Sequence, residues 1–171
     1  MNQVNYQKEL EKILNTLQEK GGAASDYRPP RLFLHSCCAP CSSYCLEYLC
    51  RYFLITVFYY NPNISFSEEH QKRVAEQKRL IATYNKEEKG WPIDIVEGDY
   101  EPERFYEMAK GYENCPEGGE RCLRCFDLRL RRTAELAAGG DYDYFATTLT
   151  ISPLKNAEKI NEIGERMAEK Y

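Results

Sequence analysis

The sequence predicts an α/β fold in which a parallel sheet carries helices on both faces. Short apolar runs, rich in β-branched and aromatic residues, alternate with longer segments of helical periodicity along the 171 residues. Glycine, proline and asparagine fall between these segments, where turns are expected. Strands that alternate with helices form parallel sheets, because each crossover helix returns the chain to the same edge of the sheet.

Length and composition describe an ordinary globular domain. The chain has 43% hydrophobic and 29% charged residues, and 171 residues suffice for one domain with a sizeable core. A net charge of −4 gives no general attraction to nucleic acid, so an RNA partner would need a local basic patch. The N-terminus lacks a signal-peptide core, and no stretch approaches the ~20 apolar residues that span a bilayer. We therefore expect a cytoplasmic protein with no membrane partner.

The expected elements follow from periodicity and turn residues. An amphipathic helix is predicted over residues 4–20 and a glycine- and proline-containing linker after it. We therefore divide the chain into an N-terminal helix and linker, residues 1–28, and a single α/β domain, residues 29–171. The last helical pattern reaches residue 171 without a stop signal, which indicates either a truncated chain or a natural protein that continues beyond it.

Four strands and five further helices are predicted within the domain. The strands are expected at 31–34, 53–60, 91–96 and 144–149, and the helices at 42–51, 65–84, 102–110, 120–138 and 156–170. Ser65 and Glu68 have the spacing of a capping box for the second of these helices. His70 lies on that charged helix, where we expect it to be solvated.

The eight cysteines are the feature of the sequence that composition does not explain. Cys37, Cys38 and Cys41 come directly after the first core strand, in the kind of loop where α/β proteins place their chemistry. Cys122 and Cys125 lie three residues apart on a predicted helix and so share a face. Without an export signal, clustered cysteines favour metal or redox chemistry over disulfides. We predict that these five cysteines form one metal site.

The cysteine pattern does not identify the metal. Tetrahedral zinc and an iron–sulfur cluster both accept thiolates from a strand-end loop and a helix. A thiol oxidoreductase that uses Cys122 and Cys125 without metal is a further alternative. The remaining cysteines have simpler interpretations: Cys45 and Cys50 as small buried side chains, and Cys115 as incidental.

Histidine and arginine residues near the cysteines have two interpretations each. His35 ends the first strand two residues before Cys37; it is either a hydrogen-bonded core residue or a residue that orients the site or donates a proton. Five arginines lie between residues 121 and 132, and such a run is usually a solvated face. Arg129 and Arg132 share the cysteine side of their helix, so the second interpretation is that they approach phosphate of an anionic substrate.

Four ordered motifs carry a resemblance to a known family. These are HSCCAPC at 35–41, YNPNI at 60–64, CLRCFDLR at 122–129 and FATTLTISPLKN at 145–156. Together they resemble the QueH-type epoxyqueuosine reductases, from about residue 32 to the end of the chain. The N-terminal helix lies outside the resemblance. Members of this family usually continue to a C-terminal Cys-Gly-Cys segment, which these 171 residues lack.

The resemblance implies a Rossmann-like fold related to the adenine-nucleotide alpha-hydrolase group, and an oxidoreductase that converts epoxyqueuosine to queuosine at the wobble position of tRNA. The implied partners are tRNA carrying epoxyqueuosine and an electron donor of unknown identity. With tRNA as the substrate, we expect Arg129 and Arg132 to approach its phosphate groups or its anticodon loop. The resemblance further implies a [4Fe-4S] cluster held by Cys37, Cys38, Cys122 and Cys125, with a second mononuclear iron near Cys41. The alternative function is a zinc-stabilised RNA-binding module without redox activity.

For Cys41, the sequence spacing and the family resemblance agree least on the role of the thiol. It lies at a predicted helix start, where the helix dipole lowers the pKa of a thiol, so we expect a thiolate. We predict that this thiolate is catalytic, because it binds a second metal that acts as a Lewis acid on the epoxide. The alternative is that Cys41 is itself a cluster ligand and one of the other four cysteines is spare.

Overall fold

The core of the structure is a four-stranded sheet in which all three strand pairs are parallel. It is a computed structural model that describes residues 4–23 and 27–171. The strand order is β3-β2-β1-β4. The strands are β1 (Arg31–Ser36), β2 (Leu54–Tyr59), β3 (Ile93–Glu97) and β4 (Tyr144–Thr147). The predicted α/β class and its Rossmann-like parallel sheet are confirmed.

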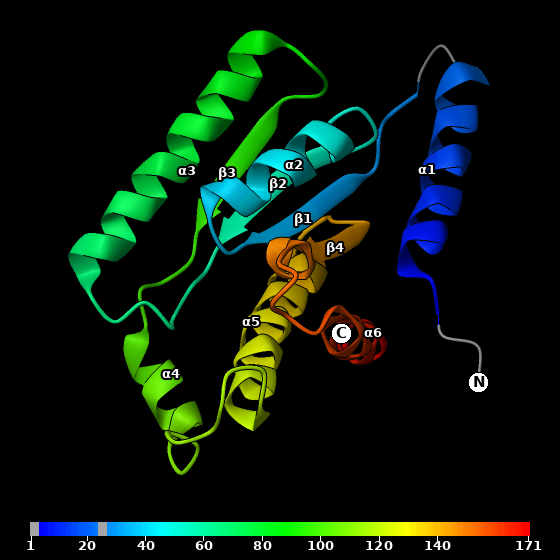
Figure 1. Ribbon diagram of the computed structural model, residues 1–171. Helices are drawn as coiled ribbons and strands as arrows, with labels where there is room; N and C mark the ends of the chain where they lie inside the picture. Colours follow the sequence, from blue (N-terminus) through cyan, green and yellow to red (C-terminus); the bar gives the residue numbers. More distant parts are fainter. Residues whose placement is uncertain (1–3, 24–26) are drawn as a thin grey trace.

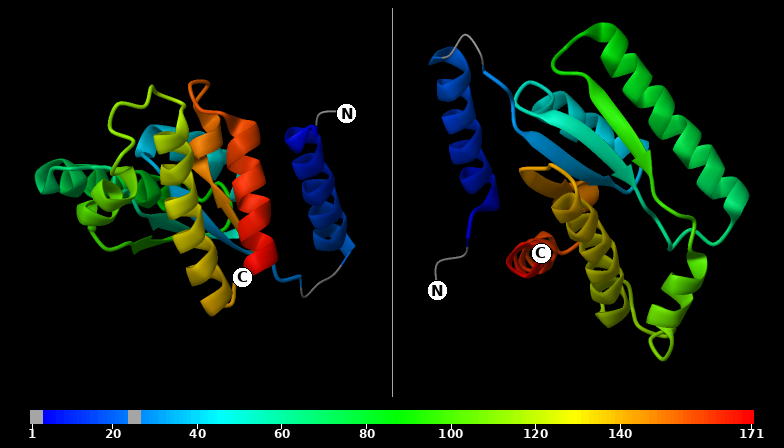
Figure 2. Two further views of the ribbon diagram at one scale, coloured as in Figure 1. Left: turned by 90° about the horizontal axis from the view of Figure 1, so that it is seen from below. Right: turned by 180° about the vertical axis from the view of Figure 1, so that it is seen from behind.

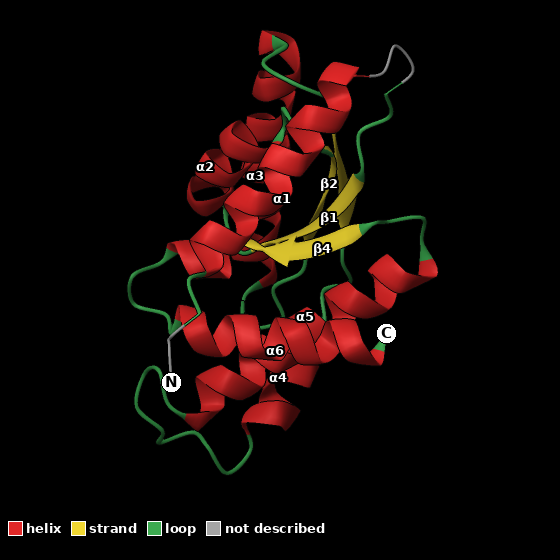
Figure 3. Cartoon of the chain, turned by 90° about the vertical axis from the view of Figure 1, so that its right-hand side faces the viewer, coloured by secondary structure: helices red, strands yellow, loops and turns green. Residues whose placement is uncertain are grey.

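Helices cover both faces of this sheet, as predicted. They are α1 (Tyr6–Ala23), α2 (Ala39–Leu49), α3 (Ser67–Glu87), α4 (Pro102–Ala109), α5 (Glu120–Gly139) and α6 (Ala157–Lys170), with a short 3₁₀ helix, η1 (Thr148–Ile151). Figure 1 and the side view of Figure 3 show α1, α2 and α3 on one face and α4, α5 and α6 on the other. Both views of Figure 2 place α5 and α6 side by side.

The alternation of side chains along β1 divides the core between the two faces. Leu32 and Leu34 pack among residues of α1, α2 and α3, whereas Phe33 packs toward α5 with Phe58 and Ala137. This division follows from the two-residue period of a strand. Because both faces of the sheet are buried, the central strands consist of near-continuous apolar residues.

The observed boundaries differ from the predicted ones by at most three residues; β4, for example, ends at Thr147, two residues before the predicted end, because the chain continues into η1. α2 begins at Ala39, three residues before the expected start, because Pro40 fits the first turn, where a backbone N–H has no helical partner. The predicted capping box at Ser65 is wrong: Phe66 precedes the first turn of α3 and no side chain caps it. Asn156, by contrast, caps α6 by accepting from the Lys159 N–H at 3.0 Å.

The N-terminal helix packs against the sheet domain. Leu14 and Leu17 of α1 are buried in the same apolar cluster as Leu32 and Leu46. Residues 1–3 and 24–26, which include part of the expected linker, lie outside the described residues. None of the described helices has the length and apolar composition needed to cross a membrane.

His70 is buried, so its predicted solvation is wrong. Its side chain packs between Tyr59 and Tyr100, with ring centroids 5.6 and 4.8 Å from its own. The first turn of α3 lies against the end of β2, which a charge pattern along one helix does not reveal. Burial lowers the pKa of His70 below its ordinary value, because the charged imidazolium loses its hydration.

We predict that His70 makes the protein less stable as the pH falls below about 6.5, the ordinary histidine pKa. Below that pH the unfolded chain binds the proton more readily than the folded chain, so the free energy of unfolding decreases. A His70→Phe variant keeps a ring between the two tyrosines and lacks this loss. The difference in unfolding free energy between variant and wild type should therefore shift in favour of the variant between pH 7.5 and 5, measured by urea denaturation.

Both proteins in this comparison retain His35, so His70 alone accounts for the difference. A constant offset between the two proteins across the pH range would contradict the prediction.

Candidate metal centre

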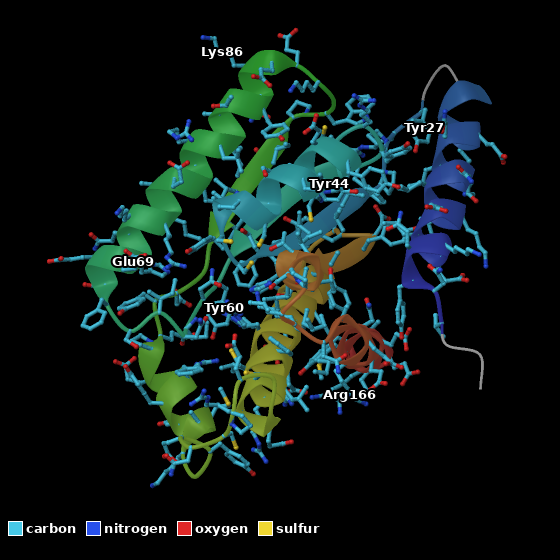
Figure 4. All side chains as sticks on the ribbon, viewed as in Figure 1. Tyr27, Tyr44, Tyr60, Glu69, Lys86 and Arg166 are labelled. Carbon is cyan, nitrogen blue, oxygen red and sulfur yellow. The ribbon has the colours of Figure 1, made fainter. Side chains whose placement is uncertain are left out.

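The carboxyl ends of three neighbouring strands meet at one edge of the sheet. Parallel pairing aligns Ser36 with Tyr59 and His35 with Thr147, so β1, β2 and β4 end together. The residues that follow these ends therefore gather in one region. Tyr60, labelled in Figure 4, marks this edge between the end of β2 and α5.

Three thiols lie together at this edge, as the sequence predicted for the strand-end loop. The Sγ atoms of Cys37, Cys38 and Cys41 all lie within 4.8 Å of one another, and those of Cys37 and Cys38 are 3.7 Å apart. Cys37 follows β1, Cys38 occupies the N-cap of α2, and Cys41 lies in its first turn. Each of the three residues is partly exposed, so the group can be reached from solvent.

The chemistry and spacing of this group fit a thiophilic metal. All three donors are cysteine sulfurs, which zinc and iron–sulfur centres accept. A tetrahedral ion with metal–sulfur bonds of about 2.3 Å places its ligand sulfurs about 3.8 Å apart. The Cys37–Cys38 separation of 3.7 Å matches that spacing for a single ion. Three protein ligands also leave a fourth position open, as in catalytic sites.

Thr148, the first residue of η1, holds Cys37 in place. The Cys37 N–H donates to Thr148 Oγ1 at 3.1 Å, and the Thr148 hydroxyl donates to Cys37 Sγ at 3.3 Å. Hydrogen bonds from Cys38 and Thr148, the former the stronger effect, lower the pKa of Cys37 to about 5. The pKa of Cys38 is raised because its proton is shared with Cys37. One thiolate therefore forms readily within the group.

The pKa of Cys41 is shifted in the direction opposite to the expected one. Its pKa is raised, first by burial and also by the negative charge that develops on Cys37. We expected the N-terminus of α2 to lower this pKa, but the neighbouring thiols and burial have the larger effect. A bound cation would reverse the balance, because a coordinating thiol loses its proton.

Cys122 and Cys125 lie on the first turns of α5, outside the group of three thiols. Cys122 borders the apolar cluster formed by α5, α6 and η1, and Cys37 borders the same cluster. The Gly118 N–H donates to Cys122 Sγ at 3.3 Å. Cys125 is buried, which raises its pKa. The two segments thus face the same core, but the 4.8 Å group contains only the cysteines of the strand-end loop.

His35 is fully buried, with both ring nitrogens engaged. Nδ1 lies 2.8 Å from Thr147 Oγ1, and Nε2 lies 2.9 Å from the Tyr60 carbonyl oxygen. Because a carbonyl only accepts, Nε2 carries the proton and Nδ1 accepts from Thr147. Burial, followed by the charge of Arg129, lowers the pKa of His35 to about 3. The ring is therefore neutral and connects the ends of three strands.

The two arginines expected near RNA differ in their surroundings. Arg129 is buried, at 4% exposure, and donates through Nη2 to Asn61 Oδ1. The side chain of Arg132 is 32% exposed and lies within 3.9 Å of carboxylates of Asp99 and Glu135. Of the two, Arg132 is the one within reach of a ligand on the surface.

The other cysteines occupy separate positions. Cys45 and Cys50 are buried within the apolar cluster of α1, α2 and α3, which confirms their prediction as core residues. Cys115 lies in the turn before α5 and is partly exposed. None of the three belongs to the group of close thiols.

Sequence reasoning gave no role to three residues of this edge. Thr148 bonds Cys37, Asn61 bridges β1 and α5, and the charge of Lys155 acts on His35, Cys41 and Cys125. All three follow strands whose ends meet at the thiols. The available signal was that all three belong to the motifs that carry the family resemblance, but assigning their roles required the strand order.

The comparisons with known proteins agree on one family. Residues 32–171 match the family model described as epoxyqueuosine reductase QueH. Proteins of that name from Staphylococcus epidermidis, Streptococcus pyogenes and Acinetobacter baylyi are 41%, 42% and 40% identical over 94%, 79% and 82% of this chain. The chain spans 66%, 52% and 62% of the lengths of these relatives.

We predict that Thr148→Val destabilises the metal-free protein by about 1–2 kcal/mol, the net contribution of its two partly buried hydrogen bonds with Cys37. Valine matches threonine in shape, so the change removes the two hydrogen bonds and little packing. The measurement is the free energy of unfolding by urea denaturation.

Thr83→Val is the matched control, because Thr83 is exposed on α3 and its hydroxyl donates to the Arg79 carbonyl of the same helix. Its effect should stay within about 0.5 kcal/mol. Equal effects of the two changes would show that Thr148 does not support Cys37.

Proposed function

The chain belongs to the epoxyqueuosine reductase QueH family, and from this premise we propose that it reduces epoxyqueuosine to queuosine at the wobble position of tRNA. The structural observation that supports the proposal is the group of three close thiols at the carboxyl edge of the sheet. Such a site offers a soft metal-binding surface where α/β folds bind substrates. A tRNA substrate further implies a cytoplasmic location.

The proposed cofactor is a [4Fe-4S] cluster held by Cys37, Cys38, Cys122 and Cys125. Its support is the apolar cluster that Cys37 and Cys122 both border, because this cluster brings the strand-end loop and the first turn of α5 to one region. We further propose a mononuclear iron at Cys41. When bound, these groups would supply single electrons and a Lewis acid.

The protein's own residues would position the substrate beside the thiols. Removing an epoxide oxygen as water takes two electrons and two protons, so an external electron donor is required. His35 is neutral at physiological pH, with its only ring proton committed to the Tyr60 carbonyl. We therefore propose that His35 orients the strand ends and that another group, or water, delivers the protons. Arg132, with its partly exposed guanidinium, is the proposed phosphate contact.

A zinc-stabilised RNA-binding module is the alternative function, and no comparison supports it. The test is anaerobic purification followed by iron, sulfide and zinc analysis. A brown protein with iron and sulfide, which converts epoxyqueuosine in tRNA when given a chemical reductant, supports the proposal. A colourless zinc protein that binds tRNA without converting the base supports the alternative.

We predict that Cys37→Ser, Cys38→Ser, Cys122→Ser and Cys125→Ser each strip most iron or leave a degraded cluster. A serine hydroxyl is a harder and less acidic ligand than a thiol, so it replaces a cluster ligand poorly. The measurement is iron and sulfide per chain after reconstitution.

Cys115→Ser is the control and should keep full iron content, because Cys115 belongs neither to the group of three thiols nor to the apolar cluster that Cys37 and Cys122 border. Full iron and sulfide in all four ligand variants would mean that the ligands are assigned wrongly.

For Cys41 we predict a different result. Cys41→Ala should retain the cluster, lose about one iron atom per chain and lose epoxide reduction, as expected for an open catalytic position. The measurements are iron and sulfide content and conversion of epoxyqueuosine in tRNA. Loss of the whole cluster would instead make Cys41 a cluster ligand, and normal turnover would exclude both roles.

A further inference from the structure

Arg129 is a buried charge without a carboxylate partner. It is 4% exposed, and within the described ranges 4–23 and 27–171 no acidic side chain lies within 4.0 Å of its guanidinium nitrogens. Its Nη2 donates to the neutral Asn61 amide, and its Nε has no partner. Burying a charge is costly unless an opposite charge compensates it, and an amide cannot do so. An anion close to Arg129 would therefore compensate its buried positive charge.

The cysteines of the proposed metal centre are the groups placed to supply that anion. Arg129 lies one helical turn after Cys125 on α5, so both share a face of the helix. Asn61 connects the guanidinium to β1, because its Nδ2 donates to the Ser36 carbonyl at 3.0 Å, one residue before Cys37.

We propose that Arg129 is the internal counter-ion of the thiolate centre. Its fixed positive charge compensates the Cys37 and Cys125 thiolates and any metal group bound to them, and so favours the reduced, more negative state of that group. This assigns Arg129 a positioning and electrostatic role in place of contact with RNA phosphate. The inference rests on the proposed metal centre, but not on the identity of the substrate.

Three complementary variants isolate the charge. Arg129→Gln removes it, whereas Arg129→Lys keeps it on a different side chain. Asn61→Asp leaves Arg129 in place and neutralises it with a carboxylate of nearly the same shape. Arg132→Gln is the matched control, since Arg132 lies on the same helix but pairs with carboxylates at the surface.

The measurement is the reduction potential of the reconstituted centre, titrated by visible absorbance, together with iron per chain. Removing a positive charge should make the centre harder to reduce. Arg129→Gln and Asn61→Asp should each lower the equilibrium constant for one-electron reduction at least tenfold, which is about 59 mV. Arg129→Lys should stay within threefold of wild type, and Arg132→Gln should be unchanged. A merely structural arginine would affect stability without moving the potential in Asn61→Asp.

The outcomes separate this inference from the proposed function. Wild-type potentials in loaded Arg129→Gln and Asn61→Asp would overturn the inference and leave the function intact. If Arg129→Gln takes up no iron, the other two variants decide. Iron uptake by Arg129→Lys supports the inference. If Arg129→Lys also takes up no iron while Asn61→Asp has the wild-type potential, the inference is overturned.

A wild-type chain that takes up no cluster would overturn the proposed function alone. The inference is then tested with Co²⁺ bound to the same thiols of the metal-free protein. Arg129→Gln should bind Co²⁺ at least tenfold more weakly than wild type, because thiolates form less readily without the cation. Equal affinities would overturn the inference.

Discussion

The parallel pairing of β1 with both β2 and β4 is the constraint on which the rest of the structure depends. Parallel neighbours end at the same edge, so the segments after three strands meet although they lie far apart in sequence. Cys37, Asn61 and Thr148 each begin one of these segments. The register also sets His35 beside Thr147, where the imidazole accepts its hydrogen bond. A shift of one residue in either pair would turn these side chains to the opposite face of the sheet.

Hydrogen bonds among buried polar groups hold this edge of the sheet in one conformation. The Ser36 hydroxyl lies 2.6 Å from that of Ser42 and donates to Gln77 Oε1 at 2.8 Å, which joins β1, α2 and α3. On the opposite face, Asn61 joins β1 to α5. Because an unpaired buried polar group is costly, alternative packings at this edge are disfavoured. The thiol loop is therefore held between two helical layers before any metal binds.

Much of the fold followed from local pattern. The dense apolar runs identified all four strands, and glycine, proline and asparagine marked the turns between them. The errors occurred where tertiary contacts override local preference. His70 lies in a charged sequence yet is buried by two tyrosines from other segments, and Ser65 has a capping spacing that the chain does not use.

By itself, the sequence determined the α/β class and the strand-end position of Cys37, Cys38 and Cys41, because periodicity and turn residues act over a few neighbours. It also indicated that thiols, rather than carboxylates, form the site. Only the tertiary structure decided which side chains support those thiols and what charge surrounds them. Nothing in the sequence distinguishes Arg129 from Arg132, yet Arg129 is buried against Asn61 and Arg132 is not. Burial and the identity of distant partners depend on how the strands are ordered and which helix face meets the sheet, and no local pattern encodes that arrangement.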